Sequence, residues 1–309
     1  MMSPVLKGGI VAAVLGALFV MAGFWAGFAL ARADVQPRLP LGDAAAEAGQ
    51  ASPSGPPHPG FAPLQDSVTR LLRAGGATGA VTLTELEGPS PQTWALNGDQ
   101  RFVAASTYKL PLLMAEAQNV AAGRWRGTDT LCFQSSDYED GYYQDYQDGT
   151  CMSRSQLDHR VGLNSDNTAA HILVRYGGGV DVLNKYAQSH GARQSTFFVP
   201  NMTTTNDLAR LWVDEATGKA GGKAAQQYLY PMLTRTAYEN GIPAGVPAGT
   251  TVVHKIGIVD DQVNDAALVL KGPRGSYVLT ICTEGPGGDA GWRVLANISN
   301  AVWQYEATR

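Results

Sequence analysis

The sequence is poor in the side chains that bind metals or nucleic acids. It contains only three cysteines and five histidines in 309 residues, and no two of them have the spacing of a metal-ligand pair. The 23 Lys and Arg residues are outnumbered by 27 Asp and Glu, and no basic run occurs. We therefore expect no metal, no cofactor and no nucleic-acid partner. No internal repeat is present, and 44% apolar residues allow a large core.

Long apolar runs are also scarce, and the longest lies near the N-terminus. Lys7 is followed by an uninterrupted apolar stretch, Gly8–Ala31, which is long enough to cross a hydrocarbon layer of about 30 Å. Two alternatives exist for residues 1–34: a signal peptide cleaved after Ala31 or Ala33, or an uncleaved signal anchor, which the length of the run favours. Either predicts an exported, extracytoplasmic protein, which the anchor would hold at the membrane and cleavage would release.

Residues 35–61 are rich in Ala, Gly, Pro and Ser. Such a segment cannot bury enough apolar area to offset the entropy lost on ordering it. We predict a flexible spacer there, followed by a folded domain over residues 62–309.

Export would permit a disulfide bond in that domain. Cys132 and Cys151 flank a polar stretch rich in Tyr, Asp and Gly, and bridging them would stabilise this stretch by about 3 kcal/mol. The tyrosines of the stretch belong either to a solvated loop or to the rim of a cleft. Cys282 lies in an apolar strand pattern, which predicts a buried thiol.

The order of predicted elements indicates a mixed fold. We predict an α/β fold of the α+β kind, with one antiparallel five-stranded sheet built from both chain ends and flanked by the first and last helices. An all-helical lobe, about residues 105–235, would be inserted into the sheet lobe, with a ligand cleft between the two. The pattern predicts strands over 79–86, 93–97, 251–258, 265–270 and 277–283, and helices over 61–75, 106–122, 154–163, 166–176, 180–189, 205–217, 220–234 and 290–305.

The first of three chemical motifs is Ser106-Thr107-Tyr108-Lys109, where an extended segment turns into a helix. Residues three apart share a helix face, so the amine can reach the hydroxyl. A serine needs a base to take its proton, and a lysine whose pKa is lowered by burial can be that base. An N-cap serine beside a solvated lysine is the structural alternative, because this short motif is common by chance. Pro111 predicts an irregular first turn.

The second motif, Ser165-Asp166-Asn167, opens a later predicted helix. All three residue types are favoured helix caps, so a purely structural role is one interpretation. In the functional interpretation Ser165 relays a proton to the leaving group and Asp166 orients the loop. Asn167 would hold the substrate and Lys109.

The third motif is His254-Lys255-Ile256-Gly257 in an apolar strand pattern. Lys255 is either an ordinary edge-strand lysine or a buried cation that needs a partner. Gly257 would let another backbone or a ligand come close. The N–H of Ile258 could serve as an oxyanion donor.

Together the motifs resemble the S-x-x-K, S-D-N and K-T-G set of class A β-lactamases and penicillin-binding proteins. The resemblance covers the chain from about Phe61 to the end. It implies that Ser106 is the acylated nucleophile, that Lys109 is its base, and that Ser165 and Lys255 relay the proton. It also implies an oxyanion hole made of the N–H groups of Ser106 and Ile258. The implied substrate-binding residues are Asn167, Gly257 and Ile258.

Two features depart from the family pattern. Class A β-lactamases carry a loop glutamate that activates the deacylating water, but residues 189–200 contain no Asp or Glu. One general base contributes about 10²–10⁴-fold in rate, so we predict slow deacylation. The second departure is Ile256, where the family has Thr or Ser to help hold the substrate carboxylate; isoleucine cannot donate a hydrogen bond. His254 or Arg293 could replace that hydroxyl.

The resemblance implies a class A β-lactamase-like serine hydrolase that forms an acyl-enzyme with a β-lactam or related amide. One alternative is a cell-wall DD-peptidase, a carboxypeptidase or transpeptidase acting on a peptidoglycan stem peptide, which the missing glutamate and the tethered position favour. The other is a non-catalytic wall-peptide-binding protein, which Ile256 favours and the intact Ser106 and Lys109 disfavour.

Overall fold

The computed structural model of the chain describes residues 59–88 and 90–308. The predicted leader, residues 1–34, and most of the predicted spacer lie outside the described residues. Within the described part, no helix has the length and apolar character needed to span a bilayer. The last predicted spacer residues belong to the fold, because Pro59–Phe61 form a short 3₁₀ helix and the Phe61 ring is buried against Trp94 and Tyr305.

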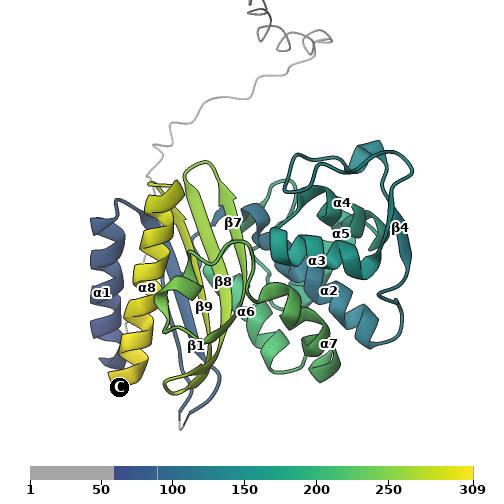
Figure 1. Ribbon diagram of the computed structural model, residues 1–309. Coiled ribbons are helices and arrows are strands. Elements are labelled where there is room, and N and C mark those ends of the chain that lie inside the picture. The colour runs from purple at the N-terminus through teal and green to yellow at the C-terminus, as the bar shows by residue number, and fades with distance from the viewer. Residues whose placement is uncertain (1–58, 89, 309) are drawn as a thin grey trace, which may run out of the picture. The chain divides into compact units, whose positions relative to one another are not determined.

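A five-stranded antiparallel sheet, in the order β2-β1-β9-β8-β7, forms the centre of one lobe (Figure 1). Two of its strands come from the N-terminal part and three from the C-terminal part, which confirms the predicted sheet. The edge strand β7 carries the third motif. The strands are β1 (Thr78–Glu85), β2 (Thr93–Leu96), β7 (Thr251–Val259), β8 (Gln262–Gly272) and β9 (Gly275–Glu284).

Helices cover both faces of the sheet (Figure 1). The first and last, α1 (Ala62–Ala74) and α8 (Gly288–Thr308), pack side by side on one face. The other face meets the predicted helical lobe. Its helices are α2 (Lys109–Ala121), α3 (Arg154–Asn164), α4 (Asn167–Tyr176), α5 (Val180–Ser189), α6 (Thr205–Ala216) and α7 (Gly222–Leu229).

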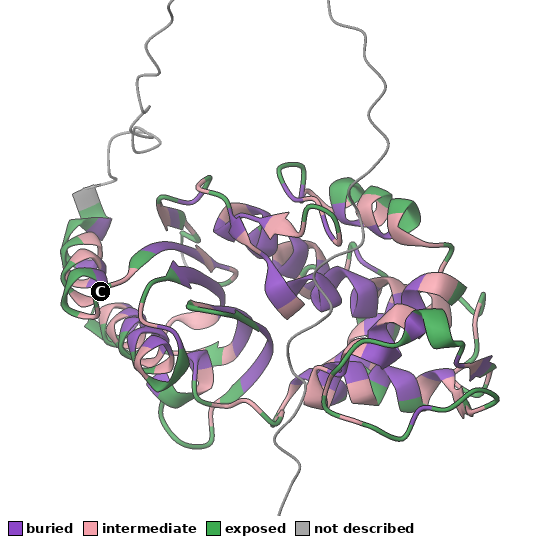
Figure 2. Cartoon of the chain, turned by 90° about the horizontal axis from the view of Figure 1, so that it is seen from above, coloured by how far each residue is buried: buried purple, intermediate pink, exposed green. Residues whose placement is uncertain are grey.

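Two buried apolar clusters lie on opposite faces of the sheet, and the buried residues gather inside each lobe (Figure 2). Successive strand side chains point to opposite faces, so Val252 contributes to the cluster under α1 and α8 while Val253 contributes to the helical lobe. The same alternation turns Lys255 toward the helical lobe and His254 away from it. This places the third motif at the boundary between the lobes.

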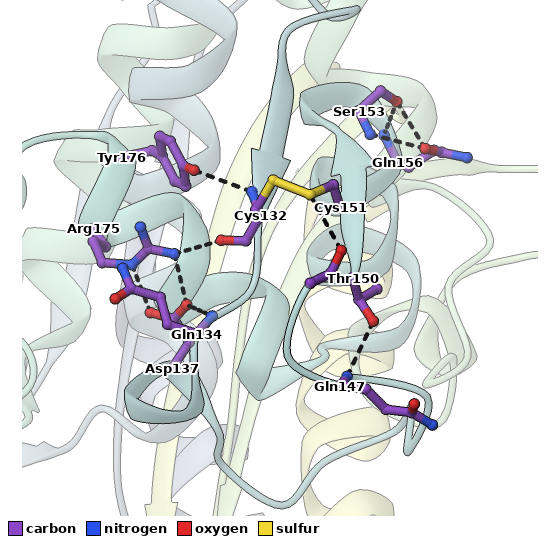
Figure 3. Close-up of a disulfide and its surroundings, with 11 residues drawn as sticks. Cys132, Gln134, Asp137, Gln147, Thr150, Cys151, Ser153, Gln156, Arg175 and Tyr176 are labelled. Atoms are coloured by element: carbon purple, nitrogen blue, oxygen red, sulfur yellow. Dashed lines mark hydrogen bonds and ion pairs between the residues drawn. A yellow bond between two sulfur atoms is a disulfide. The ribbon is translucent and has the colours of Figure 1, made fainter.

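Two short sheets were not predicted, because two- and three-residue strands are too short for a periodic pattern. One pairs β3 (Phe102–Val103) with β6 (Met202–Thr203), and the other pairs β4 (Thr130–Cys132) with β5 (Cys151–Ser153). In the second sheet Cys132 lies directly opposite Cys151, and the predicted disulfide between them is confirmed (Figure 3). Cys282 is a buried free thiol, as predicted.

Candidate active site

Ser106 lies in a tight turn that leads into α2. A 3₁₀ helix, Ala105–Tyr108, precedes the α-helix, which confirms the irregular first turn that Pro111 predicted. Ala105 has a positive φ of 46°, an unfavourable conformation for a residue with a side chain. The Asn201 side chain supports it by donating a hydrogen bond to the Ala105 carbonyl (3.1 Å). The turn that carries Ser106 therefore includes one residue, Ala105, in a backbone conformation that its side chain disfavours.

The strand β7 approaches this turn closely at Gly257. A β-carbon at that position would lie 2.5 Å from the Ala104 carbonyl oxygen and 3.0 Å from the Thr107 nitrogen. Only glycine permits this contact, so its predicted role in a close approach is confirmed. The contact brings the third motif against the backbone that carries Ser106.

The Lys109 amine contacts both of the first two motifs. Its Nζ lies 3.0 Å from Ser106 Oγ, 2.7 Å from the Ser165 carbonyl oxygen and 2.5 Å from Asn167 Oδ1. The Ser165 hydroxyl is 3.5 Å away. Lys109 is fully buried, so the alternative of a solvated lysine beside a helix cap is wrong.

Burial also sets the charge of this amine. It lowers the pKa of Lys109 to about 7, although the negative charges of Glu139 and Asp166 act in the opposite direction. Near neutral pH a large fraction of Lys109 is therefore uncharged. An uncharged amine has two N–H donors and one lone pair, which is the state that can accept a proton.

The junction between α3 and α4 carries the second motif. Ser165 ends α3 in the left-handed conformation (φ 57°), and Asp166 caps α4 by accepting a hydrogen bond from the Ala169 N–H (2.8 Å). Asp166 is fully buried and also accepts from the Tyr146 hydroxyl (2.6 Å) and the Tyr143 N–H (2.9 Å). The predicted helix cap is therefore confirmed for Asp166, while the relay role of Ser165 and the substrate-binding role of Asn167 stay predictions. Asp166 caps and anchors the loop, and its neighbours face Lys109.

Lys255 reaches the same place from β7. Its Nζ lies 2.9 Å from Ser165 Oγ and 3.0 Å from the Ile256 carbonyl oxygen. Burial, and then the nearby Lys109, lower the pKa of Lys255 well below its usual value, while Asp265 opposes the shift. The Ser165 hydroxyl therefore stands between two amines, and the four predicted catalytic residues come together.

A cavity of about 360 Å³ opens over these groups. The predicted residues Ser106, Ser165, Asn167 and Ile258 line it, whereas Gly257 contacts the nucleophile turn instead. Tyr142 is the tyrosine of the 133–150 stretch that reaches the cavity wall. The lining comprises Ser106, Gly141, Tyr142, Asn164, Ser165, Asn167, Tyr238, Ile256 and Ile258.

The suggested substitutes for a carboxylate-binding hydroxyl are not among these lining residues. His254 is buried on the α1–α8 side of the sheet, where its ring bonds Asp265 (2.9 Å) and Glu239 (3.1 Å). Arg293 lies on α8, which covers the far face. The alternation of side chains along a strand explains why His254 is absent from the cavity lining, because His254 and Lys255 must point to opposite faces of the sheet.

The model of the beta-lactamase enzyme family matches residues 63–306 of the chain. The chain belongs to this family. Its fold and its family membership together make it a β-lactamase-like serine hydrolase. No curated protein matched the chain in a separate comparison.

Solved structures similar to this β-lactamase-family protein include PBP-A, with 26% identity, a TM-score of 0.74, and coverage of 81% of this chain and 97% of PBP-A. A PBP-A variant solved as its acyl-enzyme complex with penicillin G matches with the same identity and TM-score, over 81% of this chain and 98% of that chain. A beta-lactamase from Sphaerobacter thermophilus is 27% identical, with a TM-score of 0.71. The match covers 79% of this chain and 98% of that beta-lactamase.

The loop between Cys132 and Cys151 forms one rim of the site in this β-lactamase-family protein. Arg175 holds its start by donating to the Cys132 carbonyl and pairing with Asp137, both at 2.7 Å (Figure 3). Further along, the Asn167 side chain donates to the Asp140 carbonyl (2.7 Å). The rim is therefore bonded to Asn167, which also contacts Lys109.

The sequence offered no reason to single out Glu139 in this loop, because other acidic residues surround it. Its carboxylate pairs with His171 Nε2 at 2.8 Å, and its charge acts on Lys109. His171 lies one helical turn beyond Asn167 on α4, which explains the proximity. Only the fold brings Glu139 toward the site.

The segment 189–200 places an aromatic side chain, not an acid, beside the nucleophile's helix. The Phe198 ring lies 5.0 Å from the Tyr108 ring and 5.3 Å from the His171 ring, measured between centroids. None of the nine residues that line the cavity in the described chain is Asp or Glu.

Proposed function

We propose that this protein forms an acyl-enzyme at Ser106 with a β-lactam or a related amide. The observation that carries the proposal is the convergence of Ser106, Lys109 and Ser165 at hydrogen-bonding distances beneath one open cavity. The penicillin G acyl-enzyme of the PBP-A variant supports the same chemistry.

Lys109 is the proposed base. Its two shortest contacts, to the Ser165 carbonyl and to Asn167 Oδ1, are to oxygens that only accept hydrogen bonds. An uncharged amine donates its two N–H groups to these oxygens, so its lone pair is left for the Ser106 hydroxyl. The proton of Ser106 then passes to Lys109 as Oγ attacks the substrate carbonyl.

Ser165 and Lys255 are the proposed relay to the leaving group. The Ser165 hydroxyl lies within reach of both amines, so it can pass a proton to the amide nitrogen as the C–N bond breaks, and regain one from Lys109. The N–H groups of Ser106 and Ile258 are the proposed donors to the oxyanion. Asn167 orients Lys109 and the substrate chain.

Deacylation is the proposed slow step. Water must be activated by a base to hydrolyse the acyl-serine ester, and no carboxylate lines the cavity in the described residues. Glu139, an acid whose charge reaches Lys109, is engaged by His171. The absence of such a base slows the step by about 10²–10⁴-fold.

The test of this proposal is a burst experiment. Mixing the protein with a chromogenic cephalosporin is expected to release about one equivalent of product quickly, followed by turnover at least about 100 times slower. Intact-mass spectrometry should show one bound acyl group throughout the slow phase. Rapid steady hydrolysis without a burst would disprove slow deacylation, and the absence of any adduct would disprove acylation.

The pH dependence of acylation tests the role of Lys109. Below a pKa of about 7 this amine is protonated, so the acylation rate constant should fall by about tenfold per pH unit and level off above neutral pH. Glu139→Gln removes a negative charge that raises the pKa of Lys109. The fall of the acylation rate constant on the acid side of the pH profile, the acid limb, should therefore move to lower pH. Asp140→Asn, in the exposed neighbouring residue, is the control. An unchanged limb in Glu139→Gln would show that another group titrates.

We also propose that the protein is exported, with the segment before residue 35 as its leader or membrane anchor. Membership in the beta-lactamase enzyme family supports export. Comparing the mass of the mature protein with that of the full chain tests whether the leader is removed.

A further inference from the structure

The wall of the cavity over Ser106 carries no charged side chain among the described residues. Tyr142, Tyr238, Ile256 and Ile258 form much of it, and none of the nine lining residues is Arg, Lys or His in the described chain. Tyr142 and Ile258 also keep 53% and 38% of their surface exposed at the mouth. Exposed apolar side chains around a cavity are a feature of surfaces that receive an apolar ligand.

The two amines behind this wall are poorly suited to hold an anion. Lys109 and Lys255 are each about 1% exposed or less, and their N–H groups are directed to oxygens of the protein. Burial lowers the pKa of Lys109 to about 7, so this amine is partly uncharged near neutral pH, and burial also lowers the pKa of Lys255 well below its usual value. A substrate carboxylate in the cavity would therefore be desolvated without a dedicated cation.

The imidazole of His254, two residues before Ile256 on β7, is already bonded to two carboxylates. His254 Nδ1 lies 2.9 Å from Asp265, and its Nε2 lies 3.1 Å from Glu239 and 3.2 Å from the Thr236 hydroxyl. Although burial opposes it, the two carboxylates raise the pKa of His254 to about 9, so the imidazolium persists at neutral pH. Two carboxylates thus surround one imidazolium, and one of them, Glu239, is the chain neighbour of the lining residue Tyr238.

We propose that the natural acyl donor lacks a carboxylate on the side of the cavity formed by Ile256 and Tyr238, and carries a neutral amide, ester or apolar group there. This inference rests on the proposed acylation of Ser106. A neutral group keeps the wall in apolar contact, and it avoids both an unpaired buried anion and repulsion by Glu239.

A matched pair of donors tests the inference. Benzylpenicillin and its methyl ester share the reactive amide and differ in one negative charge at the carboxyl group. Acylation of the full chain by each is followed by intact-mass spectrometry at equal concentrations. The ester is expected to acylate Ser106 at least about tenfold faster, a ratio that corresponds to about 1.4 kcal/mol.

Three variants test which residues set the preference. Ile256→Thr supplies a hydroxyl donor and should raise the rate with the acid, whereas Ile256→Val has nearly the same shape without a donor and should keep the preference for the ester. Glu239→Gln removes one negative charge and should also raise the rate with the acid. Far-UV circular dichroism of each variant shows whether the fold is retained.

The outcomes separate the inference from the function on which it rests. Equal rates, or faster acylation by the acid, would overturn the inference and leave the acyl-enzyme intact. A preference for the ester that Ile256→Val keeps and Ile256→Thr reduces would support it. If neither donor, nor a serine-reactive phosphonate, labels the protein, the proposed function is overturned together with the inference.

Discussion

Replacing Ser106 with alanine is expected to abolish covalent labelling by penicillin entirely. Ser106 Oγ lies 3.0 Å from the Nζ of Lys109, a buried amine of lowered pKa, and Ser106 lines the cavity. The alanine side chain has no atom that can form the ester. The measurement is the mass of the intact protein after incubation with benzylpenicillin, which should rise by one acyl group in the parent chain and not in the variant.

The variant should keep its fold, because it loses only one hydroxyl and the turn is supported from its backbone by Asn201. Ser135→Ala removes an exposed hydroxyl from the neighbouring loop and is the control that should label normally. An adduct of unchanged stoichiometry in Ser106→Ala would mean that the nucleophile is a different residue.

Lys109→Met is expected to slow acylation by about 10²–10⁴-fold without unfolding the protein. Methionine is apolar and close to lysine in length, so it suits a fully buried position, but it has no group that can take the Ser106 proton. The Ser165 carbonyl and Asn167 Oδ1 lose a donor, which costs about 1–3 kcal/mol for each buried group left unpaired. The rate of adduct formation and the melting temperature separate the two effects.

As a control, Lys223→Met changes an exposed lysine on α7. The rate of adduct formation and the melting temperature of this variant should equal those of the parent chain. An acylation rate within about tenfold of the parent in Lys109→Met would assign the base to another group. Lys255 would then be the next to test, because its amine also contacts the Ser165 hydroxyl.

Local patterns in the sequence predicted most of the fold. The helices and the five strands of the main sheet lie close to their predicted ranges, because apolar residues on one face of each element recur at the period of that element. The disulfide followed from a polar stretch bounded by Cys132 and Cys151. The contact between Ser106 and Lys109 followed from a separation of three residues on a helix.

The tertiary structure decided the contacts that no local period encodes. Lys255 and Ser165 are 90 residues apart, and they meet because Gly257 lets β7 come against the nucleophile turn. His254 faces the opposite side of the sheet and is bonded by Asp265 and Glu239, so it is absent from the cavity.

The sequence by itself therefore determined which groups this protein has for acyl transfer, because residue type and short spacing are local properties. Packing determined the pKa of those groups and the charges that surround them. Burial lowers the pKa of Lys109 to about 7, and it leaves the wall at Ile256 without a cation. The physical reason is that desolvation and long-range contacts depend on the elements that surround a residue, and these are assembled from distant parts of the chain.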